Sequence, residues 1–201
     1  MSKSILIGPQ VLRMAKSLRG HFLIAAKHLR DSNFYKSIVL MLEHNDEGAM
    51  GLIVNRPTEV SVSQALAKHF ELPPSEHFLF NGGPVEENAL LILHNSTDFD
   101  QEHDAIVPGV FVGTSPDIFD RVTESMSEPD SDFRFRIYSG YSGWGAGQLE
   151  FEMSRGDWFT LPATVDFVFR SDPYEIWEDV LAAFQARHRL LPDEPDSPEW
   201  N

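Results

Sequence analysis

Hydrophobic residues along the chain fall into short runs that have the length of β-strands. Five such runs lie at residues 21–26, 37–44, 51–55, 77–80 and 89–94. Short apolar runs bounded by turn formers are typical of strands in a buried sheet. The turn-rich stretch HNDEGAMG separates the second run from the third, so the sequence predicts a β-hairpin over residues 37–55.

A sixth strand is predicted where the segment FRFRIY alternates strictly between apolar and polar residues. Successive side chains of a strand point to opposite faces of its sheet. Phe133, Phe135 and Ile137 are therefore expected to face a core. Arg134 and Arg136 are expected to face water.

Helical spacing of apolar residues predicts a small number of helices between the strands. They are expected at residues 10–18, 60–70, 115–123 and 173–187. The last has the clearest apolar stripe, with Asp172 as its cap and Pro173 at its first position. Strands joined by short turns, with few helices inserted, predict an α+β fold with a mainly antiparallel sheet rather than repeating βαβ units.

The length of 201 residues suits one domain, which we expect to span residues 1–190. Residues 191–201 contain four acidic residues, three prolines and no basic residue, so they are expected to form a disordered acidic tail.

The net charge of −15 and the lack of cysteine limit the possible functions. Without cysteine the chain can form no disulfide and no thiolate site. Its composition and the short apolar run near its start predict a cytoplasmic protein without a membrane partner. An acidic protein is repelled by phosphate backbones, so nucleic acid is not expected as a partner. Residues 1–30 nevertheless carry six basic and no acidic residues, which leaves DNA binding through residues 10–30 as an alternative.

The glycine-rich stretch GYSGWGAGQ, residues 140–148, completes no known catalytic or nucleotide-binding motif. It lacks the spacing of a dinucleotide-binding loop and the lysine of a P-loop. It also fails as a nucleophile elbow, because Trp144 stands where the last glycine is required. We interpret Trp144 as a packing residue in a tight glycine turn, with Gly143 or Gly145 at positive φ.

Metal-binding patterns are incomplete as well. The acidic stretch at 98–104 lacks the glycine and the final glutamate of a calcium loop. No metal site and no cofactor are predicted.

Polar residues and glycines that follow the strands are the candidates for a ligand site, because loops at strand ends commonly carry function. The candidate ligand-binding residues are Asn55, Arg56, Gly82, Gly83, His94, Tyr141, Trp144, Gln148 and Glu150. No residue is predicted to be catalytic in the leading interpretation. In an enzymatic alternative, His94, Glu150 and Glu152 serve as acid or base and Arg56 holds an anionic substrate.

Several motifs together resemble the YqgE/AlgH family of bacterial proteins. They are NRP at 55–57, GGPV at 82–85, LH at 93–94 and GWGAGQLE at 143–150, and the resemblance extends over about residues 18–190. It implies a compact α+β domain with a barrel-like antiparallel sheet. The family carries a loose transcriptional regulator label and no established activity, so it transfers no catalytic residue.

These observations favour a cytoplasmic bacterial protein with a non-enzymatic role in regulation or in binding a protein or small molecule. Two alternatives remain open: an enzyme acting on a small anionic substrate, and a direct DNA-binding regulator.

Overall fold

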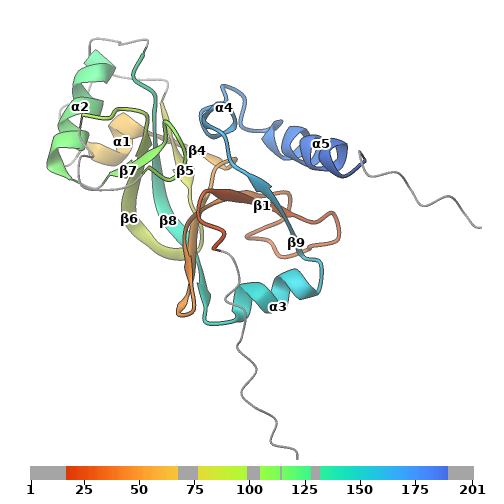
Figure 1. Ribbon diagram of the computed structural model, residues 1–201. Coiled ribbons are helices and arrows are strands. Elements are labelled where there is room, and N and C mark those ends of the chain that lie inside the picture. The colour runs from red at the N-terminus through yellow and green to blue at the C-terminus, as the bar shows by residue number, and fades with distance from the viewer. Residues whose placement is uncertain (1–16, 68–76, 99–104, 114, 128–131, 190–201) are drawn as a thin grey trace, which may run out of the picture.

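The computed structural model describes residues 17–67, 77–98, 105–113, 115–127 and 132–189 (Figure 1). Most of the helix expected at 10–18 and all of the tail expected at 191–201 lie outside these ranges. Among the described residues, no helix has both the length and the apolar character that a bilayer crossing requires.

Nine strands and five helices occur in the described part of the chain. The strands are β1 (His21–Ala25), β2 (Ile38–Asn45), β3 (Gly48–Ile53), β4 (Pro57–Ser61), β5 (Phe78–Asn81), β6 (Val85–His94), β7 (Phe111–Gly113), β8 (Phe135–Gly145) and β9 (Trp158–Pro162). The helices are α1 (Val62–Leu66), α2 (Pro116–Ser127), α3 (Gln148–Ser154), α4 (Val165–Val168) and α5 (Ile176–Arg189). This composition confirms the α+β class.

The strands form one mixed, mostly antiparallel sheet that is not closed into a barrel. Its strand order is β4-β5-β8-β3-β2-β1-β9. In addition, β6 pairs with β8, and β7 pairs with β6. β2 and β3 pair antiparallel, which confirms the predicted hairpin, and the single parallel pair described is β5 with β8. The barrel-like sheet implied by the family resemblance is wrong, because β4 and β9, at the two ends of the order, do not pair with each other.

β8 is shared by two groups of strands in this sheet. One group contains β4, β5, β6 and β7, and the other contains β3, β2, β1 and β9. The first half of β8 pairs with β6 and, at Tyr138 and Ser139, with β5. Its second half, from Ser142 onward, pairs with β3. Between the halves lies Gly140, whose φ of +68° is in the region that favours glycine. β8 therefore exchanges its partner strands β5 and β6 for β3 near Gly140, where the backbone has a positive φ.

Close backbone packing accompanies this change of neighbours. A Cβ at Gly82 would lie 2.3 Å from the carbonyl oxygen of Gly140, and one at Gly83 would lie 2.3 Å from the carbonyl carbon of Tyr141. Gly82 also donates its N–H to Ser139 O at 2.9 Å and accepts from Ile53 N at 3.0 Å. The GGPV motif is thus a place where only glycine lets two backbones meet.

The core consists of three groups of buried side chains on different parts of the sheet. The first contains Phe22, Leu40 and Tyr138 and extends to Trp177 of α5. The second lies between the sheet and α3, and the third lies under α1 and α2. Figure 1 shows α1 and α2 beside β6 and β7, whereas α4 and α5 lie on the other side of the fold.

Helix ends differ in how well the sequence predicts them. Ser61 caps α1 with a full capping box: its hydroxyl accepts from Gln64 N at 3.2 Å, and the Gln64 side chain accepts from Ser61 N at 3.1 Å. α5 begins at Ile176, three residues later than predicted. Asp172 accepts from Tyr174 N at 2.9 Å and so stabilises a turn that precedes the helix.

Replacement of Gly140 by alanine tests the close packing against β8. The added Cβ would lie 2.5 Å from Gly83 O in addition to the strain of positive φ, so we expect a loss of about 2–4 kcal/mol in the free energy of unfolding. Gly147→Ala is the matched control, because Gly147 has φ +72° with no atom within 4 Å of the added Cβ. It should cost about 1 kcal/mol in urea denaturation. Equal losses in both variants would contradict this account.

Candidate functional site

The first two candidates, Asn55 and Arg56, bind the backbone of the segment that leads into β2. Asn55 accepts from Ile38 N at 2.8 Å and donates to Lys36 O at 2.9 Å. Arg56 donates to Ser32 O at 3.2 Å and to Tyr35 O at 3.0 Å. Burial lowers the pKa of Arg56, and nearby Asp31 acts in the opposite direction. Both side chains stabilise a turn, and a ligand-binding role for them stays a prediction.

Four further candidates lie along β6, β8 and the loop between β5 and β6. Gly82 and Gly83 contact β8 as described, and Tyr141 pairs with Val85. His94, at the end of β6, is 1% exposed and stacks on Phe111 with ring centroids 5.7 Å apart. Gly82 follows Asn81, whose N–H donates to Arg56 O at 2.8 Å, so the GGPV segment runs beside Arg56.

Trp144 is buried, with 5% of its surface exposed, which confirms the prediction of a packing residue. Its backbone setting differs from the prediction, since residues 140–145 belong to strand β8 rather than to a turn. Positive φ occurs at Gly140 and Gly147, not at Gly143 or Gly145. The prediction of positive φ beside the tryptophan was wrong because pairing with β3 holds both neighbours in extended backbone.

The Trp144 side chain belongs to a network centred on the carboxylate of Glu152. The indole N–H groups of Trp144 and Trp158 donate to the same oxygen, Glu152 Oε2, at 3.0 and 2.8 Å. Gln148 donates to Oε1 at 3.0 Å and accepts from Gly145 N at 3.1 Å. The GWGAGQLE motif with the following glutamate thus forms a hydrogen-bonded unit that fixes α3 against the sheet.

Glu150 forms a second contact of α3, with the side chain of His44 on β2. His44 Nε2 lies 2.7 Å from Glu150 Oε1, while His44 Nδ1 accepts from Leu18 N at 3.0 Å. Since Nδ1 is an acceptor, the ring proton of neutral His44 is on Nε2 and points at the carboxylate. The hydrogen bond from His44 lowers the pKa of Glu150 below its ordinary value.

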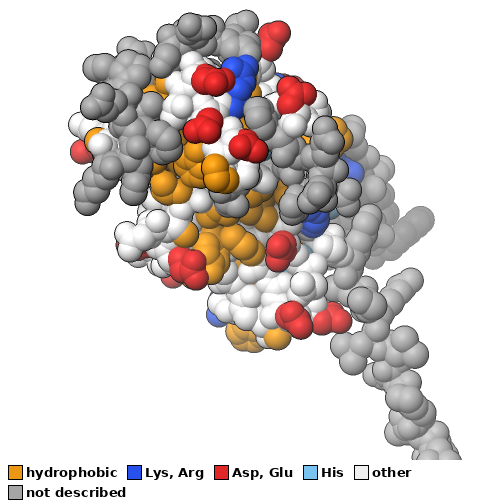
Figure 2. Space-filling model, turned by 90° about the vertical axis from the view of Figure 1, so that its left-hand side faces the viewer, with side chains coloured by type: hydrophobic (Ala, Val, Ile, Leu, Met, Phe, Trp, Pro, Cys, Tyr) orange, Lys and Arg blue, Asp and Glu red, His pale blue; other side chains and the backbone are white. Residues whose placement is uncertain are grey.

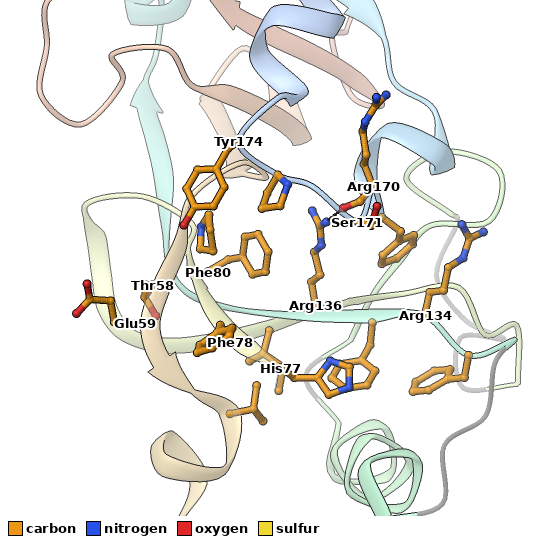
Figure 3. Close-up of a pocket in the computed structure, with 17 residues that line it drawn as sticks. Thr58, Glu59, His77, Phe78, Phe80, Arg134, Arg136, Arg170, Ser171 and Tyr174 are labelled. Carbon is orange, nitrogen blue, oxygen red and sulfur yellow. Dashed lines mark hydrogen bonds between the residues drawn. The ribbon is translucent and has the colours of Figure 1, made fainter. Parts of the chain in front are cut away.

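Sequence reasoning missed a pocket of about 730 Å³ that none of the nine candidates lines (Figure 3). It is bounded by β4, β5, the start of β8 and the segment 169–174 before α5. Its aromatic lining residues are Phe78, Phe80, Phe133, Phe135, Phe169 and Tyr174. Their spacing along the sequence is irregular, so only the fold brings these rings together.

Arg136 is buried beside Phe80, contrary to the prediction that it faces water. It is 9% exposed and donates to Val54 O at 3.1 Å and to Arg170 O. Its guanidinium carbon lies 4.6 Å from the centroid of the Phe80 ring. The alternation rule fails here because β8 is covered on both faces, on one by α1 and α2 and on the other by the segment that carries Arg170.

The two other arginines that line the pocket, Arg134 and Arg170, are less buried than Arg136. Arg134 is exposed at the rim, with its guanidinium carbon 5.4 Å from the ring centroid of Phe169. The guanidinium of Arg170 points away from the pocket in Figure 3 and forms an ion pair with Asp179 at 2.7 Å. Acidic side chains, by contrast, are scattered over the face of the molecule drawn in Figure 2, around a recess with hydrophobic side chains. Within the described lining of the pocket, Arg134 and Arg136 are accompanied by one acidic side chain, the exposed Glu59.

Tyr138, two residues beyond Arg136 on β8, stays neutral at physiological pH. Burial raises the pKa of its hydroxyl to about 12, although the positive charge of Arg136 acts in the opposite direction. The tyrosine therefore supplies no negative charge to balance Arg136.

Residues 22–189 match the protein family described as AlgH-like (DUF179). A UPF0301 protein from Chlorobium chlorochromatii is 35% identical over 187 residues, which cover 92% of this chain and 96% of the relative. A UPF0301 protein from Hahella chejuensis is 39% identical over 161 residues, covering 79% and 84% of the two chains.

Two solved structures are also similar. The solution structure of the AlgH protein from Pseudomonas aeruginosa has a TM-score of 0.67 and 31% identity, and the match covers 98% of this chain and all of that one. A crystal structure of a protein from Corynebacterium diphtheriae has a TM-score of 0.64 with 21% identity, covering 86% and 90% of the two chains. The second likeness shows the fold alone.

Substitution of Trp144 tests its structural role. Trp144→Ala should cost roughly 3–5 kcal/mol in chemical denaturation, as is typical of truncating a buried tryptophan. Trp144→Phe should cost less, because it keeps a ring beside Phe34 and Trp158 and loses only part of the buried ring together with the donation to Glu152. A loss below about 1 kcal/mol for the alanine variant would show that Trp144 packs little and is free to recognise a partner.

The His44–Glu150 contact predicts a dependence of stability on pH. Because the pKa of Glu150 is lowered in the folded state, its ionised form stabilises the fold above the unfolded pKa of about 4.5, and this contribution is lost as the pH falls through the folded pKa. Glu150→Gln should therefore lower stability at pH 7 by less than about 1 kcal/mol, since the carboxylate is 44% exposed. Melting curves of the two proteins should converge at acidic pH, and a constant difference would refute the linkage.

Proposed function

Because this chain belongs to the AlgH-like family, whose function is uncharacterised, we propose from its own geometry that it is a non-enzymatic protein that binds a small acidic molecule through Arg136. The ligand would occupy the aromatic pocket, and binding would serve a regulatory role. A cytoplasmic location, as expected from the sequence, is part of this proposal.

One observation carries the proposal: Arg136 is a buried cation whose described hydrogen-bond partners are backbone carbonyls. Among the residues that the structure describes, no Asp or Glu carboxylate lies within 4.0 Å of its guanidinium. Burying an unpaired charge costs several kcal/mol. The carbonyls of Val54 and Arg170 use two of the five N–H donors of the guanidinium, and an incoming carboxylate or phosphate would use others and supply the missing charge.

The groups that the enzymatic alternative assigns to acid–base catalysis, His94, Glu150 and Glu152, do not lie at the pocket. Arg56, which that alternative assigns to the substrate, already donates to two backbone carbonyls. The DNA-binding alternative depends on residues 10–30, part of which lie outside the described chain, and it stays a prediction.

Two fluorescent probes of similar shape test the role of Arg136. Anilinonaphthalene sulfonate carries one negative charge, and phenylnaphthylamine has the same rings without it. We expect the native protein to bind the charged probe at least about tenfold more tightly, because hydrogen bonds to a charged group contribute about 1.5–3 kcal/mol. Arg136→Met should abolish this preference while leaving binding of the neutral probe nearly unchanged.

Arg56→Met is the matched control, since Arg56 also donates to two backbone carbonyls. It should lower stability but keep the preference for the charged probe. Near-ultraviolet circular dichroism should show that all variants are folded. If Arg56→Met removes the preference, or Arg136→Met retains it, the proposed site is wrong.

A further inference from the structure

We propose that the acidic molecule held by Arg136 is a flat aromatic acid, in which a rigid ring system carries a carboxylate or a phosphate. This inference rests on the proposed function, because it names the chemical class of ligand for the same pocket. The aromatic side chains that line the pocket are its basis, whereas the charge of Arg136 is the basis of the proposed function.

The walls of the pocket are unusually rich in aromatic rings. Six of its 17 lining residues are Phe or Tyr, compared with 11% aromatic residues in the whole chain. They come from β5, from the start of β8 and from the segment before α5, so rings face the space from several sides. Aromatic pairs attract each other beyond the effect of buried area, so such walls favour an aromatic ligand over an aliphatic one.

Neighbouring side chains hold several of these rings in place. Phe135 stacks on Phe133 at 5.6 Å and also contacts His77 at 4.8 Å. Phe80 packs against the buried Tyr138 ring at 5.5 Å, and Arg134 covers Phe169. Fixed walls suit a rigid ligand, because a flexible chain loses rotational freedom on entering while a flat ring system loses little.

The position of the arginines determines which acidic groups fit. Figure 3 shows the Arg136 side chain beside Phe80 and extending toward Arg170 and Ser171, with Arg134 farther along the same segment. A planar guanidinium binds a carboxylate or a phosphate with two parallel hydrogen bonds. Arg134 is two residues away on the same segment, about 7 Å along the backbone, so a dianionic phosphate can gain from both charges. The volume of about 730 Å³ is ample for two fused rings and an acidic group.

Competition experiments on the native protein test the ligand class. Bound anilinonaphthalene sulfonate is displaced with naphthoate, with undecanoate, which has the same number of carbon atoms and the same carboxylate, and with naphthyl phosphate. We expect naphthoate to compete at about tenfold lower concentration than undecanoate. Naphthyl phosphate should compete as well, and Arg134→Met should weaken its binding more than that of naphthoate. A phosphate that fails to compete would restrict the class to carboxylates and overturn the role given to Arg134.

Phe135→Leu tests the aromatic wall, and Phe159→Leu is its control. Both rings are partly buried and stacked on another phenylalanine, but Phe159 pairs with Phe184 away from the pocket. Phe135→Leu should weaken naphthoate several-fold and leave undecanoate unchanged, whereas the control should change neither. Should Phe135→Leu not fold, the comparison on the native protein decides the question.

The outcomes separate this inference from the proposed function. If undecanoate competes as well as naphthoate while Arg136→Met still abolishes the charge preference, the aromatic class is wrong and the acid site stands. If neither acid competes and Arg136→Met has no effect, both are wrong.

Discussion

The contact between the Gly82–Gly83 backbone and the bent strand β8 is the constraint on which the rest of the structure depends. Gly140, at φ +68°, lets β8 leave β5 and β6 and continue beside β3, and the two glycines of the GGPV motif fit against it where a Cβ would collide with backbone. β8 is thereby shared by two groups of strands, although Gly140 within it has a positive φ that is more typical of turns. These glycines are required for the close approach of the two backbones.

The two halves of β8 have different consequences for chemistry. Its second half places Trp144 over the sheet, where the indole helps to fix Glu152 and α3. Its first half is covered on both faces, and this burial leaves the Arg136 guanidinium beside the Phe80 ring, with backbone carbonyls as its described hydrogen-bond partners. A polar residue on a strand that is buried on both faces is costly unless it has a partner, and a bound acid would be such a partner.

The strands that follow from local sequence patterns could be predicted. The burial of residues by segments that are distant in the sequence could not. Apolar runs located β1, β2 and β3, and the turn formers between β2 and β3 located their hairpin. The prediction that Arg136 faces water was wrong. Alternation shows which side chains share a face of the strand, but not which other segments of the chain cover that face. The nine candidates were chosen for lying at strand ends, whereas the rings of the pocket come from segments up to about a hundred residues apart.

Nuclear magnetic resonance with naphthoate tests the central claim most directly, because it observes the Arg136 side chain and the ligand together. The account predicts that adding naphthoate shifts the Nε–Hε signal of Arg136 and produces nuclear Overhauser contacts between the naphthyl protons and the rings of Phe80 and Phe169, while the Arg56 signal stays in place. Contacts to the Trp144 network, or a shift at Arg56 without one at Arg136, would contradict it.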